Sequence, residues 1–123
     1  MINSKSNLKL RVYKFSLLVI DFVADLPDKK LFWVFADQLL RAGTSIGANI
    51  VEARSSSSKR EFIKFYEISL KSANETKYWL CLLRDSPKLK EINEKTLNIV
   101  LREAIEIANM IGSALLTMKG KKI

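Results

Sequence analysis

The sequence predicts an all-α protein, an antiparallel up-down-up-down four-helix bundle. Apolar residues recur at helical spacing along most of the chain, and no segment sustains the period-two alternation of a strand. Only two prolines and four glycines interrupt the 123 residues, which favours a few long helices over many short elements. Apolar residues make up 48% and charged residues 28% of the chain, as in a globular protein with a substantial core. We therefore expect one domain over residues 1–123.

The first helix is expected at about residues 8–26, ending before Pro27. It carries two apolar stripes, where a single bundle core needs only one. One stripe consists of Leu10, Tyr13, Leu17, Ile20 and Ala24. The other consists of Val12, Phe15, Val19 and Phe22. This helix is therefore more apolar than the interior of one bundle requires.

The second helix is expected at about residues 29–54 and contains Gly43 and Gly47, four positions apart. A glycine inside a helix costs about 1 kcal/mol relative to alanine, so this pair indicates a place where another backbone packs closely. The expected core stripe of this helix consists of Phe35, Leu39, Ala42, Ile46, Ile50 and Ala53.

A run of four serines, residues 55–58, ends the helical pattern. Ser58 and Glu61 have the spacing of a capping box, in which the two side chains satisfy backbone donors at the start of a helix. The third helix is therefore expected at about residues 58–85. The fourth is expected at about residues 92–118, where apolar residues form the most regular heptad pattern of the chain.

A polar stripe runs along the second helix and continues on the third. Its members are Arg41, Ser45, Asn49, Glu52, Ser72 and Glu75. In an antiparallel hairpin Arg41 and Glu75 are candidates for an interhelical ion pair, with Asn49 and Ser72 supplying hydrogen bonds. The alternative is a carboxylate site built from Glu52 and Glu75, but about three helical turns separate them, too far for paired acid–base chemistry. We therefore interpret the stripe as structural.

The composition gives little support to an enzyme. There is no histidine, the commonest metal ligand and general base. The single cysteine, Cys81, lies among apolar residues and has no partner for an intrachain disulfide. We expect no catalytic residues, no metal and no cofactor, although a buried cofactor between the helices would reopen the question. The polar N-terminus and the lack of a 20-residue apolar run favour a cytoplasmic protein without a membrane partner.

The net charge of +8 makes a polyanion the first partner to consider. In an up-down bundle the chain's start, the serine turn and the C-terminal tail share one end, where Glu52 and Glu61 are the only acidic residues we expect. The cations expected there are Lys5, Lys9, Arg11, Arg54, Lys59, Arg60, Lys64, Lys119, Lys121 and Lys122. That end would carry the whole net charge, which predicts sequence-independent contact with nucleic-acid phosphates. The alternative is a lysine tail and a helix end that are merely solvated.

Two segments, Leu39–Glu52 and Lys59–Phe65, resemble the signature of bacterial four-helix-bundle proteins encoded in 23S ribosomal RNA intervening sequences. The family is also similar to the accessory variability determinant of diversity-generating retroelements. The resemblance covers about residues 8–118. The positions that match in order and spacing are Arg41, Ser45, Asn49, Ile50, Glu52, Glu61, Phe62, Phe65, Ser72 and Glu75. The chain departs from the family pattern after Glu52, where four serines replace a segment usually containing glycine and an aromatic residue.

The resemblance implies a left-handed bundle that assembles into a homopentamer and has no known enzymatic activity. It also implies binding of RNA or DNA and, in the retroelement branch, a reverse transcriptase as partner. The surplus apolar stripe of the first helix fits such an oligomer independently. The favoured hypothesis is a non-enzymatic oligomeric bundle that binds nucleic acid through its basic pole as a scaffold or accessory subunit. The alternative is a protein–protein interaction module with no nucleic-acid ligand.

Overall fold

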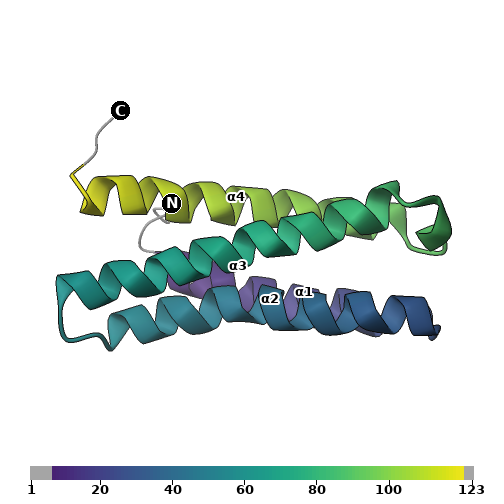
Figure 1. Ribbon diagram of the computed structural model, residues 1–123, viewed down its shortest axis with the longest axis horizontal. Helices are drawn as coiled ribbons and strands as arrows, with labels where there is room; N and C mark the ends of the chain where they lie inside the picture. The colour runs from purple at the N-terminus through teal and green to yellow at the C-terminus, as the bar shows by residue number, and fades with distance from the viewer. Residues whose placement is uncertain (1–6, 121–123) are drawn as a thin grey trace.

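The computed structural model describes residues 7–120, and its regular structure there is entirely helical. The elements are α1 (Leu8–Ala24), α2 (Lys30–Arg54), α3 (Lys59–Asp85), the short 3₁₀ helix η1 (Pro87–Leu89) and α4 (Glu94–Met118). The four long helices lie side by side (Figure 1). Each long helix packs against its neighbour in the chain, and α1 also packs against α4. The predicted all-α fold is confirmed, and the predicted helix ends agree within two residues.

Contacts between neighbouring helices fix their relative directions. In α3, the Ser69 hydroxyl donates to the carbonyl of Ile46, and the Ser72 hydroxyl donates to the Ser45 hydroxyl. Since the α3 residue number rises as the α2 number falls, the two helices are antiparallel. As a result the start of α1, the α2–α3 turn and the end of α4 lie at one end of the bundle (Figure 1). We call this end the basic pole.

The core lies between the four helices. Its largest fully buried side chains come from all of them and are Phe15, Leu39, Ile46, Ile50, Leu80, Leu83, Leu97, Ile107 and Ile111. The two apolar stripes of α1 differ in burial. The stripe that begins at Val12 is buried, whereas four residues of the other stripe are 45–62% exposed, namely Leu10, Tyr13, Leu17 and Ile20. One stripe therefore fills the core and the other faces away from it.

The capping box at the start of α3 forms, but the Glu61 side chain bonds the residue before the N-cap and not the N-cap itself. The backbone N–H of Glu61 donates to the Ser58 hydroxyl over 3.1 Å, as the spacing predicts. The Glu61 carboxylate accepts from the N–H of Ser57 over 3.0 Å. Both interactions satisfy donors that a helix start leaves without an intrahelical partner. They fix where the serine turn ends and where the cations of α3 begin.

The two glycines of α2 give α1 room to approach. A Cβ atom added at Gly43 would lie 2.9 Å from the side chain of Val19, and one at Gly47 would lie 3.3 Å from the backbone oxygen of Val12. Both glycines are buried. The prediction that they mark a close helix contact is confirmed.

We expect Gly43→Ala to lower the free energy of unfolding by about 1–3 kcal/mol, because the new methyl group overpacks a filled contact. The matched control is Gly112→Ala in α4, where an added Cβ would meet nothing within 4 Å. That substitution should raise stability by about 0.5–1 kcal/mol through helix propensity. Urea unfolding followed by circular dichroism measures both. Equal stabilisation by the two alanines would contradict the close α1–α2 packing.

Candidate nucleic-acid interface

The basic pole gathers those predicted cations that fall within the described residues. They are Lys9, Arg11, Arg54, Lys59, Arg60, Lys64 and Lys119, contributed by α1, α2, α3 and the residue that follows α4. The other predicted cations, Lys5, Lys121 and Lys122, lie outside the described residues. The predicted convergence of three chain segments is therefore present.

Arg11 does not face a ligand at this pole. Its Nε lies 2.7 Å from Glu103 Oε2, and its Nη2 lies 2.6 Å from Glu106 Oε1. Hydrogen bonds to the Glu103 and then the Glu106 carboxylate raise the pKa of the Arg11 guanidinium above its ordinary value. Arg11 therefore ties α1 to α4, and its assignment to a phosphate-binding surface is corrected.

Lys119 is also neutralised, by an ion pair with Glu67 of α3. The sequence analysis placed only Glu52 and Glu61 at this pole. It missed Glu67, Glu103 and Glu106 because they lie inside helices and meet the pole only through the register of neighbouring helices. Fewer cations at the pole are therefore left without an acidic partner than the composition predicts.

Four cations remain close together around the serine turn. Arg54 ends α2, whereas Lys59, Arg60 and Lys64 occupy the first turns of α3. All four side chains belong to exposed residues, and within residues 7–120 none of them forms an ion pair with a carboxylate. We call these four residues the turn cluster.

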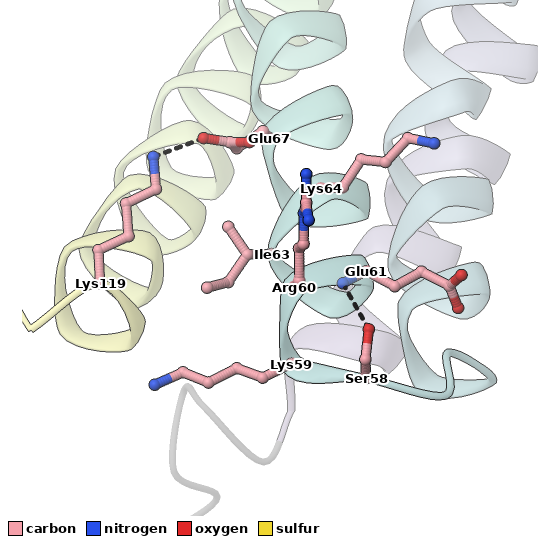
Figure 2. A pocket seen from close by; sticks show the side chains of 8 residues that line it. All are labelled: Ser58, Lys59, Arg60, Glu61, Ile63, Lys64, Glu67 and Lys119. Carbon is pink, nitrogen blue, oxygen red and sulfur yellow. Dashed lines mark hydrogen bonds and ion pairs between the residues drawn. The ribbon is translucent and has the colours of Figure 1, made fainter.

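An open hollow of about 900 Å³ adjoins the turn cluster. Figure 2 shows Lys59 extending from the start of α3 and Lys119 reaching from the end of α4 toward Glu67, with Ile63 between the two lysines. In the same view Lys119 is held by Glu67, while Arg60 and Lys64 extend from successive turns of α3. The arrangement offers exposed ammonium and guanidinium groups to an anion, but among the described residues that line the hollow it brings together no set of converging acid–base groups.

The family model of the 23S rRNA-intervening sequence protein matches residues 6–113. The chain belongs to this family. A solved structure of a protein of unknown function from the S23 ribosomal protein family of Bacteroides thetaiotaomicron has a TM-score of 0.79 and 33% sequence identity. The match covers 88% of this chain and 97% of that one. A comparison with curated proteins found no match.

The resemblance to intervening-sequence proteins is thus confirmed by the family match. The similarity to the retroelement accessory determinant, and with it a reverse-transcriptase partner, stays a prediction. Among the helices of residues 7–120, none combines the length and apolar character that crossing a bilayer requires.

The polar stripe of this intervening-sequence protein is structural at its centre. The Ser72 hydroxyl bonds the Ser45 hydroxyl over 3.0 Å, and Asn49 Nδ2 donates to the Ser45 carbonyl over 2.8 Å. Ser69 of α3 is buried, and its hydroxyl donates to the Ile46 carbonyl over 2.8 Å. The bonds of Ser69 and Ser72 join α3 to α2, whereas the Asn49 bond lies within α2.

The expected ion pair between Arg41 and Glu75 does not form. Arg41 Nε lies 3.2 Å from Asp37 on its own helix, and its side chain is 76% exposed. Glu75 accepts a hydrogen bond from Trp79 Nε1 over 3.2 Å. Both charges stay at the surface because water solvates them better than an interhelical contact would. Glu52 is also exposed.

A group of exposed apolar residues lies on the outer side of α1 and α2. Its exposed residues are Leu10, Tyr13, Leu17, Ile20, Leu40 and Val51. The two helices meet where a Cβ at Gly47 would lie 3.4 Å from Ser16 Oγ. Tyr13 and Ile20 lie one turn on either side of Ser16, and Val51 lies one turn from Gly47, so the apolar residues flank this seam. We call this surface the α1–α2 face.

Arg11 supplies a test of its structural role. We expect Arg11→Gln to lower the free energy of unfolding by about 1–2 kcal/mol, because it leaves the partly buried Glu103 carboxylate and the exposed Glu106 carboxylate without their shared cation. Affinity for nucleic acid should change less than about threefold. Paired urea unfolding and oligonucleotide titration make the distinction. A large loss of affinity at unchanged stability would show instead that Arg11 contacts the nucleic acid.

Proposed function

We propose that this protein is a non-enzymatic, oligomeric scaffold that binds RNA or DNA through its phosphate backbone. The turn cluster is the observation that carries the proposal. Four cations occupy one short stretch of chain, and no carboxylate of the described residues pairs with them. Three of them extend from the first two turns of one helix, where the helix dipole also favours negative charge.

The chemistry of the cluster indicates sequence-independent recognition. Two of its four members are lysines, whose flexible ammonium groups act as point charges toward phosphate. Each phosphate contact releases condensed counterions, and this release supplies most of the affinity of non-specific binding. The other two members, Arg54 and Arg60, present planar guanidinium groups that bond phosphate oxygens in a bidentate manner. Phosphate contact is therefore the interaction that these residues support best.

Fluorescence anisotropy with labelled single- and double-stranded RNA and DNA tests this proposal. Saturable binding of at least one of the four probes is the expected result. Absence of binding to all four at low salt would refute it and favour a protein–protein interaction module.

The α1–α2 face supports the oligomeric part of the proposal. Large apolar side chains exposed together on a protein surface commonly mark an interaction site. None of the six residues that define this face is charged, so a second copy of the chain could cover these side chains without burying an unpaired ion among them. The same face is the observation that favours the rival function, binding of a different protein. A pentameric subunit number is the expectation from the resemblance.

A further inference from the structure

We infer that the pocket between the start of α1 and the end of α4 accepts one unpaired nucleobase of a bound single strand. This inference rests on the proposed function, because the phosphates of the same strand would lie on the turn cluster. It adds a site for a neutral aromatic ring to a surface that otherwise contacts only the phosphate backbone of the nucleic acid.

The pocket exists because α1 is shorter than α4. The two helices contain 17 and 25 residues, and Arg11 fixes their register against Glu103 and Glu106. The last turns of α4 therefore extend past Leu8, the first residue of α1. The resulting pocket has a volume of about 470 Å³, which lies within the range of small-ligand sites.

The lining of the pocket suits a flat, uncharged ring. Leu8, Met110, Met118 and the ring of Tyr66 supply its apolar surface, while the exposed residues Asn109 and Ser113 add polar groups. Within the described residues no charged side chain lines it. Thioether sulfurs and aromatic rings contact nucleobases favourably, and amide or hydroxyl groups can bond a base edge. A described cation that contacts this lining is Arg11, whose Nη1 lies 3.3 Å from Met110 Sδ and whose charge is paired with Glu103 and Glu106.

Tyr66 connects the pocket to the turn cluster. Its ring stacks on Phe62 with centroids 4.8 Å apart and planes 22° apart. Phe62 in turn lines a second hollow together with Arg54 and Lys59. Burial raises the pKa of the Tyr66 phenol, and the charge of Arg54 partly opposes that rise, which places the guanidinium within electrostatic reach. The stacked rings of Tyr66 and Phe62 thus lead from the pocket to the cations Arg54 and Lys59, and aromatic rings beside cations are the pattern used to bind single strands.

Methionine methyl NMR tests the inference directly. The chain has three methionines, and two of them, Met110 and Met118, line the pocket. Protein labelled with ¹³C at the methionine methyls is titrated with a single-stranded adenylate dodecamer. A second titration uses a dodecamer with the same backbone but no bases, and Met110→Leu and Met118→Leu assign the signals. We expect ring-current shifts of both methyls with the first probe and none with the second. The probe without bases should also bind roughly tenfold more weakly by anisotropy.

Ala114→Trp fills the pocket and should abolish both the methyl shifts and the tenfold preference. The matched control is Ile105→Trp, an exposed position of the same helix away from the pocket, which should retain both. If Ala114→Trp fails to fold, Thr117→Phe at the exposed rim takes its place.

Each other outcome overturns the inference. Equal binding of both dodecamers without methyl shifts would refute the base pocket and leave the backbone interface standing. Methyl shifts caused by deleting residues 2–6, and none caused by the adenylate probe, would assign the pocket to the chain's own N-terminal segment. Failure of both dodecamers to bind would refute the pocket, and failure of single- and double-stranded RNA and DNA alike would refute the proposed function as well.

Discussion

Replacing Lys59, Arg60 and Lys64 together with glutamine is expected to weaken nucleic-acid binding by roughly 10- to 100-fold, because non-specific affinity comes almost entirely from phosphate contacts. The three side chains are exposed and no described carboxylate depends on them, so the fold should be unaffected. Anisotropy titration at fixed low salt measures the loss, and circular dichroism confirms that the helices remain.

A matched triple at the opposite end of the bundle separates local contact from net charge. Lys88, Lys90 and Lys95 lie in and around η1 and the start of α4, and all three are exposed. Their replacement with glutamine removes the same number of positive charges but should weaken binding less than about threefold, since screening limits charge effects to roughly 10 Å. Equal losses for the two triples would show that overall charge, and no particular surface, attracts the ligand.

Leu17→Asp is expected to reduce the assembly to a monomer of 14.0 kDa. Leu17 lies on the α1–α2 face and is 46% exposed, so the aspartate is solvated in the single chain. Association with a second copy would bury an unpaired charge, which costs several kcal/mol. Light scattering coupled to size-exclusion chromatography measures the mass, and the thermal midpoint should stay within a few degrees of the wild type.

Ile105→Asp is the control for this prediction. Ile105 is 41% exposed on α4 and does not belong to the α1–α2 face, and its replacement should leave the assembly intact. A monomeric wild-type protein, or a Leu17→Asp variant of unchanged mass, would contradict self-association through this face.

The fold could be predicted because its determinants are local. Helical spacing identified all four long helices, and the spacing of Ser58 and Glu61 located the start of α3. The glycines of α2 indicated close packing for the same reason, since an unfavourable residue inside a helix requires a compensating contact. The second apolar stripe of α1 could also be predicted from the sequence, because the buried and the exposed apolar residues lie on different sides of that helix.

The candidate site could be predicted only in part, because its electrostatics depend on register between helices. Arg11 was assigned to the pole from its position in the chain, but α1 packs beside α4 so that Glu103 and Glu106 meet its guanidinium. The pocket beside Tyr66 depends on where α1 ends relative to α4. Neither relation is encoded in the spacing of residues along a single helix.

The salt dependence of affinity tests the central claim most directly. Anisotropy titrations with a short DNA duplex, from about 50 to 200 mM salt, give the slope of log affinity against log salt concentration. Four phosphate contacts, one for each residue of the turn cluster, predict a slope of about −3.5. A slope near zero would contradict phosphate binding, and one near −9 would mean that all ten predicted cations are engaged, Arg11 and Lys119 included.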